Sequence, residues 1–317
     1  MKLARPTQWS KSIFVAIGPL YGIAEVSGRL DGSVSITGLI LAIIAFAFAS
    51  SACYVINDIR DVEADRLHPR KRKRPIASGA VGVQTGIMYA LGLLLAAAVA
   101  VGSIALIDTT AWVETHNDPT SRAMWLGACV GLHVANVLLY SLVLKRHPII
   151  DVMSLSLGFV LRVLGGCAAA GVEPSTWLLN TVFFVAMFLA FGKRLGERRT
   201  MGDDAAGVRG VQSSYTDDVL RMSVVVTAVA ALITYANYVQ DKADAFTRGF
   251  NLLWLTMLPA SYGLFRAFLL LERGVYDDPT ELAVKDRAFQ AACVLFAIIM
   301  GVLLWMVKSD TGLTTSV

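Results

Sequence analysis

Three aspartates follow an apolar segment at a spacing that suits a helix. Asp58, Asp61 and Asp65 stand at positions i, i+3 and i+7, so a helix that continues past Ile56 carries all three on one face. Carboxylates gathered in this way repel one another and require a compensating cation. Hard oxygen ligands suit Mg²⁺, which proteins usually share with substrate phosphates. The spacing therefore predicts that these aspartates form a catalytic Mg²⁺ site, with Asn57 beside them to bind substrate.

A basic run follows the aspartates within a few residues. It contains Lys71, Arg72, Lys73 and Arg74, and His68 precedes it. Cations beside a metal site fit a substrate that carries a diphosphate, because Lys and Arg side chains bind phosphate oxygens. The alternative is that the carboxylates only neutralise the neighbouring cations in a solvated loop. The regular spacing of the aspartates favours the diphosphate site, to which we assign Lys71 and Arg74.

A second set of polar residues recurs at helical spacing further along the chain. Asp151, Ser154, Gly158 and Arg162 stand at i, i+3, i+7 and i+11. An arginine that deep in a membrane helix costs ~2.5 kcal/mol or more unless it is paired or hydrated. We therefore expect Arg162 to contact an anionic substrate, the alternative being a structural pair with a carboxylate or carbonyl groups. Asp151 is expected to bind substrate, and whether it also ligates metal stays open.

Other candidate substrate-binding residues lie at the ends of apolar segments. Lys193 and Arg194 end one such segment, and Arg198 follows one turn later. Cations there suit the helix dipole, but they also form a plausible grip on a phosphate. Tyr215 lies in the loop that follows, and we expect it to bind substrate.

Tyr140 and Lys145 precede the apolar segment 149–170, and both are assigned to substrate binding. For Tyr140 the alternative is an aromatic residue at the membrane interface. For Lys145 and its neighbour Arg146 the alternative is a role in orientation only.

The elements that position these residues are apolar blocks. The chain has 317 residues, of which 56% are hydrophobic and 16% charged. Most of the blocks are long enough to cross a bilayer of ~30 Å as a helix at about 1.5 Å per residue. We therefore expect an all-α polytopic membrane bundle of nine helices, forming one domain over residues 1–317. The blocks are 12–26, 36–56, 83–107, 123–144, 149–170, 176–192, 219–239, 249–271 and 288–307.

The lysines and arginines gather on one side of this predicted bundle. If the segments alternate across the bilayer, most of the 28 basic residues share the side of the N-terminus, and Arg162 lies within a helix. The positive-inside rule then predicts a cytoplasmic N-terminus and an active site at the cytoplasmic face of the cell membrane. Nucleic acid is not an expected partner, because these cations lie at membrane edges. The residues on the other side are Arg29, Arg122, Lys242, Arg248 and Lys308.

The segment that carries the aspartates resembles a known family. The stretch "INDIRDVEADRLHPRKRKRPIASG" is similar to the first aspartate motif of the UbiA superfamily of intramembrane prenyltransferases. It most resembles the decaprenyl-phosphate phosphoribosyltransferase branch of that superfamily. Four further stretches share that resemblance: "RPTQWSKS", "YSLVLKRHPIIDVMSLSLGFVLRVLGG", "AFGKRLGERR" and "SSYTDDVLR".

The resemblance implies a nine-helix fold and a Mg²⁺-dependent transfer reaction at the cytoplasmic face. The donor would be 5-phosphoribosyl 1-diphosphate, the acceptor a polyprenyl (decaprenyl) phosphate, and the product a precursor of cell-wall arabinan. Lys193, Arg194 and Arg198 would then hold the donor's 5-phosphate, with Tyr215 near the ribose. The superfamily's second motif has two or three aspartates, whereas this chain offers only Asp151.

Two other functions remain open from the sequence. An aromatic prenyltransferase of quinone biosynthesis would use a prenyl diphosphate, but a fuller second aspartate motif would be expected. A non-enzymatic transporter of anionic solutes would explain Arg162, but a carboxylate group at one face only is unusual in transporters. Whether the chain forms a homo-oligomer is also open.

Overall fold

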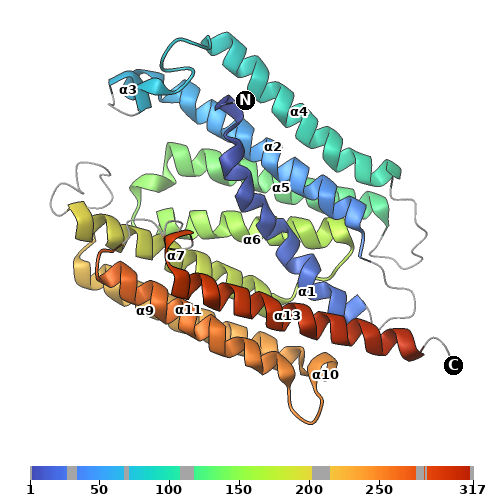
Figure 1. Ribbon diagram of the computed structural model, residues 1–317. Helices are drawn as coiled ribbons and strands as arrows, with labels where there is room; N and C mark the ends of the chain where they lie inside the picture. Colours follow the sequence, from blue (N-terminus) through green and yellow to red (C-terminus); the bar gives the residue numbers. More distant parts are fainter. Residues whose placement is uncertain are drawn as a thin grey trace. The chain divides into compact units, whose positions relative to one another are not determined.

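The described part of the chain is almost entirely helical. The computed structural model describes residues 2–26, 34–67, 71–107, 118–201, 215–275, 282 and 284–314. Within those residues the only β-structure is an isolated bridge between Thr247 and Asn251. Among these residues, eight helical segments are long and apolar enough to cross a membrane. This confirms the predicted class of an all-α polytopic membrane protein, whose helices are drawn in Figure 1.

The long helices correspond to the predicted apolar blocks. They are α2 (Ile36–Arg60), α4 (Val83–Ile107), α5 (Pro119–Leu142), α6 (Ile150–Ala170), α7 (Thr176–Met201), α9 (Asp217–Asp241), α11 (Met257–Glu272) with the 3₁₀ helix η7 (Leu252–Thr256) before it, and α13 (Arg287–Thr314). The shorter elements are η1 (Lys2–Ala4), η2 (Pro6–Ala16), α1 (Ile17–Val26), α3 (Val62–Leu67), η3 (Lys71–Lys73), η4 (Leu144–Arg146) and α10 (Ala243–Phe246).

The first predicted span is where the count of eight differs from the expected nine. Residues 6–16 adopt the tighter 3₁₀ conformation as η2, which has proline at its first turn. The α-helix that follows, α1, has only 10 residues, which is too short to cross a bilayer by itself. The other eight predicted blocks each coincide with a candidate span.

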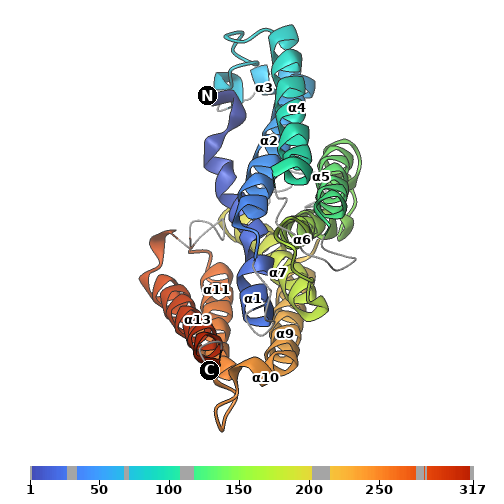
Figure 2. The same cartoon turned by 90° about the vertical axis from the view of Figure 1, so that its right-hand side faces the viewer.

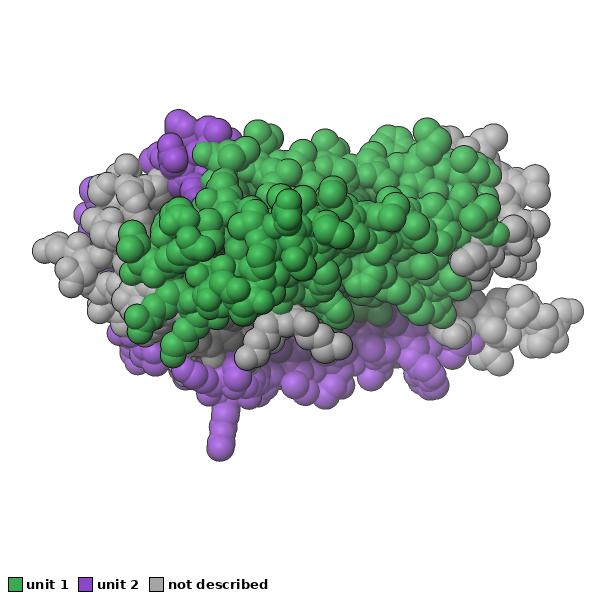
Figure 3. Space-filling view, turned by 90° about the horizontal axis from the view of Figure 1, so that it is seen from above, with its two compact units in different colours: residues 1–22, 34–142, 161–174 green, residues 23–33, 143–160, 175–317 purple. Residues whose placement is uncertain are grey.

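The chain divides into two compact units, coloured green and purple in Figure 3. Unit 1 comprises residues 1–22, 34–142 and 161–174. In it α2 lies alongside α4 and α5, as both ribbon views show (Figures 1 and 2). Ala42, Ala45 and Ala49 on α2 are fully buried around Phe46, and Leu126 of α5 closes the same core. Small side chains at these positions let the helices approach closely in an environment where lipid gives little hydrophobic driving force.

The N-terminal segment of unit 1 packs against the second half of α6 through glycines. A side chain at Gly166 would place its Cβ 1.8 Å from the carbonyl oxygen of Val15, and one at Gly18 would meet Cys167 Sγ at 2.2 Å. Contacts this short exclude any residue larger than glycine without movement of the backbone at Val15. The N-terminal segment is therefore fixed to α6, and it carries Arg5 to a defined place.

Unit 2 comprises residues 23–33, 143–160 and 175–317. Its core joins the start of α6 to α7, α9 and α11, with Val152, Phe188, Phe191 and Leu195 among the buried side chains. Thr216 caps α9 by accepting a hydrogen bond from the Val219 amide. Such a cap satisfies an amide that the helix itself leaves unpaired.

Ion pairs also connect the elements of unit 2. Arg221 of α9 donates two hydrogen bonds to Glu272 of α11, and Arg266 of α11 donates two to Asp286, which precedes α13.

Candidate functional sites

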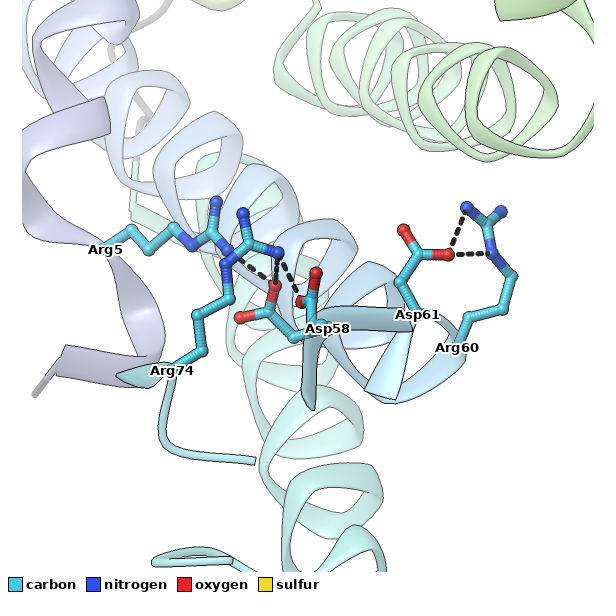
Figure 4. Close-up of polar contacts among 6 residues, drawn as sticks. Arg5, Asp58, Arg60, Asp61 and Arg74 are labelled. Atoms are coloured by element: carbon cyan, nitrogen blue, oxygen red, sulfur yellow. Dashed lines mark hydrogen bonds and ion pairs between the residues drawn. The ribbon is translucent and has the colours of Figure 1, made fainter. Parts of the chain in front are cut away.

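The acidic motif and the basic run of unit 1 meet in one cluster. Arg74 Nη1 lies 3.2 Å from Asp58 Oδ1 and 2.6 Å from Asp65 Oδ2. Arg5 Nη2 approaches the same oxygen of Asp58 to 2.5 Å, and its guanidinium lies 5.1 Å from the centre of the Tyr54 ring. Both carboxylates are buried, whereas the side chains of Arg5 and Arg74 are 27% and 30% exposed. Figure 4 shows the two guanidinium groups directed toward Asp58. We call these four charged residues the Asp58 cluster.

Asp61 does not point into this cluster. Helix α2 ends at Arg60, and Asp61 has φ −92° and ψ 11°, outside helical geometry. The chain resumes as α3 at Val62, so the continuous helical face expected for Asp58, Asp61 and Asp65 is interrupted. Asp61 accepts two hydrogen bonds from Arg60 instead, and Figure 4 shows the pair directed away from Asp58. The partners of Asp58 and Asp65 thus differ from those of Asp61.

The described residues contain no preformed group of three His, Cys, Asp or Glu side chains around a common point. Two candidate oxygen ligands for a hard divalent cation, Asn57 and Asp58, nevertheless follow one another near the end of α2. Asn57 Oδ1 is buried without a hydrogen-bond partner among the described residues, next to the buried carboxylate of Asp58. Amide and carboxylate oxygens are the ligands that Mg²⁺ takes in proteins. These residues fit the cation, and the predicted Asp58, Asp61 and Asp65 ligand set remains a prediction.

An apolar layer holds the Asp58 cluster in place. Leu3 of η1, Val55 of α2, Ile76 of the loop after η3 and Ala90 of α4 form a buried group. The layer brings together the elements that carry Arg5, Asp58 and Arg74. The predicted phosphate ligand Lys71 lies on η3 and is exposed. His68 and Arg70 lie outside the described residues.

Arg5 is the functional candidate that sequence reasoning missed. Its sequence position suggested only a role in membrane orientation, and its partner Asp58 is 53 residues away. It also has a positive φ of 47°, which is uncommon for a residue other than glycine. The one available signal was its place in the stretch "RPTQWSKS" that carried part of the family resemblance.

A second buried cluster lies in unit 2. Arg194 Nη2 donates a hydrogen bond to Asp151 Oδ2 at 3.0 Å, and the Tyr215 hydroxyl donates to Asp151 Oδ1 at 3.1 Å. Asp151 has no exposed surface, and Arg194 and Tyr215 are 1% and 3% exposed. Burial raises the pKa of Tyr215 to about 12, so its hydroxyl remains a hydrogen-bond donor at every physiological pH. These contacts tie α7 and the segment that precedes α9 to the start of α6.

The other predicted residues near this cluster are more accessible. Arg198 donates to Asp217 Oδ1 at 2.7 Å and to the Tyr215 carbonyl at 2.8 Å, and its side chain is 28% exposed. Lys193 is half-buried on α7, and Lys145 is half-buried on η4. Of the three cations predicted to bind the phosphate, Arg194 is therefore buried and paired, whereas Lys193 and Arg198 are more accessible.

Arg162 lies buried within unit 1, on the part of α6 that belongs to that unit. Its Nη2 donates to Ser50 Oγ at 3.2 Å, and the same hydroxyl lies 3.2 Å from His133 Nε2. His133 Nδ1 is buried and has no partner among the described residues. Tyr140, two turns further along α5, is half-buried. Arg162 therefore belongs to a polar group inside the helices, as expected for an arginine within a span.

The fold and these clusters define a class: a multi-pass membrane protein whose long helices end in ion-paired groups of acidic and basic side chains. Residues 21–294 match the UbiA prenyltransferase family, and the chain belongs to that family. A decaprenyl-phosphate phosphoribosyltransferase of Corynebacterium glutamicum is 32% identical, over 95% of this chain and 86% of that protein. A protein of the same name from Mycolicibacterium smegmatis is 33% identical, over 92% of this chain and 87% of that one.

Solved structures agree with the fold. The structure of a UbiA homolog from Archaeoglobus fulgidus bound to DMAPP and Mg²⁺ aligns with a TM-score of 0.65 at 17% identity, covering 97% of this chain and 98% of that one. At that identity the likeness establishes the helical architecture. The predicted membership of the UbiA superfamily is confirmed.

Proposed function

We propose that this protein transfers 5-phosphoribose from 5-phosphoribosyl 1-diphosphate to a polyprenyl phosphate such as decaprenyl phosphate, with release of diphosphate. The observation that carries the proposal is the similarity to two decaprenyl-phosphate phosphoribosyltransferases over more than nine-tenths of this chain. The product would serve as a precursor of cell-wall arabinan. The N-terminus and the reaction site are proposed to face the cytoplasm, where a water-soluble sugar diphosphate is available.

The Asp58 cluster is proposed to bind the diphosphate of the donor. Asp58, Asp61 and Asp65 would hold Mg²⁺ with Asn57, and the bound cation would neutralise charge on the departing diphosphate. Arg5 and Arg74 pair with Asp58 in the structure. Both guanidinium groups would donate to diphosphate oxygens of the bound donor, for which their geometry is suited. Lys71, exposed beside them, would add a further cation.

The reaction requires no strong general base on the protein. A polyprenyl phosphate oxygen is already an anion near neutral pH, so it attacks C1 of the ribose directly. A bond forms between that oxygen and C1 while the bond from C1 to the diphosphate oxygen breaks, and the electron pair leaves with the diphosphate. Positive charge develops on the sugar ring, as in other glycosyl transfers. Attack opposite the leaving group predicts inversion at C1.

Other residues are proposed to bind the anionic parts of the two substrates. Lys193 and Arg198, which are half-buried on α7, suit the 5-phosphate of the donor better than the buried Arg194 does. Lys145, which lies on η4 in the turn before α6, and Tyr140, which lies on α5, are assigned to the lipid phosphate. Arg162 is assigned to an anionic substrate within the helices.

The test is a transfer assay with the full chain in membranes. It would use labelled 5-phosphoribosyl 1-diphosphate, a series of polyprenyl phosphates, and either Mg²⁺ or EDTA. We expect a labelled lipid only with Mg²⁺. Asp58→Asn is expected to lower kcat by about 10²-fold or more, the scale seen when one strong electrostatic contact to the reacting groups is removed.

Glu63→Gln serves as the matched control, because the Glu63 side chain is 80% exposed and its ion pair among the described residues is a local one with Arg66. Transfer of a prenyl group from a prenyl diphosphate to an aromatic acceptor, without transfer of phosphoribose, would refute the proposal in favour of the aromatic prenyltransferase.

A further inference from the structure

A strained residue stands immediately before α6. Ile149 has a φ of 67°, a left-handed conformation that a β-branched residue adopts very rarely. Packing does not impose it, because Ile149 is 53% exposed. Its backbone amide donates a hydrogen bond to the Tyr215 hydroxyl at 2.5 Å. Strained conformations of this kind persist only where the surroundings determine them and are frequent at functional sites.

The Tyr215 hydroxyl is itself held from two sides. It accepts from Ile149 and donates to Asp151, whose other oxygen accepts from Arg194. The Tyr215 ring packs edge-to-face on Phe191 with 6.2 Å between centroids. The phenol and the Asp151 carboxylate therefore use their hydrogen-bonding capacity on the protein, in a place with almost no exposed surface. We refer to Tyr215, Asp151 and Arg194 as the α6 latch.

The latch controls the direction of a basic turn. Lys145 and Arg146 lie on η4, and His147 and Pro148 connect η4 to Ile149. The turn is joined to α6 by hydrogen bonds from the Asp151 amide to the His147 carbonyl and from the His147 amide to the Leu144 carbonyl, both 3.0 Å. Because each φ angle redirects the chain that precedes it, the conformation of Ile149 decides where Lys145 and Arg146 point relative to α6.

We propose that the α6 latch holds Ile149 in its left-handed conformation and thereby aims Lys145 and Arg146 at the phosphate of the lipid acceptor. The turn joins two membrane helices, so it lies at the depth of lipid phosphates. Tyr215 and Asp151 are positioning residues in this proposal, and Asp151 is not a metal ligand. The expected change in KM rests on the proposed transfer reaction, whereas the latch itself does not.

The sharpest test uses glycine at position 149, because glycine takes positive φ without strain. Four forms of the full chain are compared: wild type, Tyr215→Phe, Ile149→Gly and the double variant. Tyr215→Phe keeps the ring and removes only the hydroxyl. It is expected to raise KM for polyprenyl phosphate about fivefold, the effect of losing one hydrogen bond of typical net strength. In the Ile149→Gly background the same substitution is expected to have little effect.

Two further measurements separate this proposal from its alternatives. KM for 5-phosphoribosyl 1-diphosphate and the Mg²⁺ concentration for half-activation are expected to stay unchanged in Tyr215→Phe and Asp151→Asn. A rise in that Mg²⁺ concentration for Asp151→Asn would instead make Asp151 a metal ligand and overturn the proposal. Tyr262→Phe, at a 51% exposed tyrosine on α11, is the control.

The unfolding temperature of the same four forms tests the latch without the reaction. Tyr215→Phe is expected to lower it less in the wild-type background than in the Ile149→Gly background, because an isoleucine freed from the hydrogen bond can leave its strained conformation, whereas glycine has no strain to release. Equal losses in both backgrounds, in unfolding and in KM, would refute the latch. If the wild type transferred no phosphoribose but the losses in unfolding temperature were unequal, the proposed function would be refuted and the latch would not.

Discussion

Arg5 and a divalent cation are expected to compete for the same carboxylate oxygen. Arg5 Nη2 lies 2.5 Å from Asp58 Oδ1, and only Arg74 shares that oxygen among the described contacts. Arg5→Ala therefore leaves Asp58 with one cation in place of two. A hydrogen bond to a charged group contributes about 1.5–3 kcal/mol. Because the Arg5 side chain is 27% exposed, the lower end of this range applies, which corresponds to roughly a tenfold change in an equilibrium constant.

The two effects of this substitution should have opposite signs. Without the donor, Arg5→Ala is expected to tighten Mn²⁺ binding about tenfold, because a competitor for Asp58 has been removed. With the donor present, the same variant lacks a guanidinium that donates to the diphosphate, so its affinity for the donor and its kcat should both fall. Electron paramagnetic resonance of Mn²⁺ titrated into the purified protein measures the first effect. The transfer assay measures the second.

A matched control is Arg66→Ala. Arg66 lies in the same charged region but pairs with the exposed Glu63, without contact to Asp58 or Asp65. Its loss should leave Mn²⁺ binding unchanged. Weaker Mn²⁺ binding by Arg5→Ala in the absence of donor would contradict the reasoning, because it would mean that Arg5 supports the ligand geometry instead of competing with the cation. Equal changes in both variants would mean that only the overall charge of the region matters.

Three further predictions concern packing, pH and metal. Gly166→Ala is expected to lower stability by about 1–3 kcal/mol, because its Cβ would lie 1.8 Å from the Val15 carbonyl oxygen; Gly131→Ala, with open space around it, is the control in thermal unfolding. The hydrogen bonds from Arg266 hold the pKa of Asp286 below its ordinary value in the folded protein. The stability that this carboxylate adds is therefore fully present above about pH 4, and it is lost as the pH falls through the lower pKa of the folded state. Unfolding temperatures of wild type and Asp286→Asn should therefore converge in acid, and a constant difference down to low pH would contradict the assignment. EDTA is expected to abolish transfer and Mg²⁺ to restore it, whereas transfer that persists in EDTA would exclude a metal role for Asp58, Asp61 and Asp65.

The membrane helices were predictable from sequence because their signal is local. Long apolar blocks fix the existence of α2, α4 and the later spans, since backbone groups in lipid must be paired within a helix. The first segment was less predictable, because Pro6 and the 3₁₀ conformation of η2 leave only a short α-helix after it. Composition shows where a chain is apolar, but it does not show whether an apolar segment forms an α-helix or a 3₁₀ helix.

The candidate sites were predictable only in part, because their partners are distant in sequence. The spacing predicted that Asp58, Asp61 and Asp65 share one face, and in the structure Asp58 and Asp65 both pair with Arg74. The spacing did not reveal the end of α2 at Arg60, which separates Asp61 from them. Helical periodicity assumes an unbroken helix, and it carries no information about a break made by a single residue.

Contacts between residues that are distant in sequence account for the remaining features that could not be predicted. Tyr215 and Arg194 were predicted to bind substrate, yet both bond to Asp151, from positions 64 and 43 residues away. A tyrosine in a polar loop and an arginine at a helix end give no sign of being fully buried. The positive φ of Ile149 could not be predicted either, because β-branched residues very rarely adopt it.

The charges of the Asp58 cluster balance one another, which suggests that different residues attract the donor from a distance and bind it at short range. Asp58 and Asp65 face Arg5 and Arg74 at 2.5–3.2 Å, so two negative charges are matched by two positive ones. A neutral cluster attracts a distant anion weakly, and binding there must proceed by exchange of partners at short range. Long-range attraction is left to the exposed Lys71, Arg72 and Lys73, whose effect is screened by salt beyond about 10 Å at 0.1 M ionic strength. Salt should therefore raise KM for the donor through these three residues, while kcat, which depends on the short-range exchange, should respond much less.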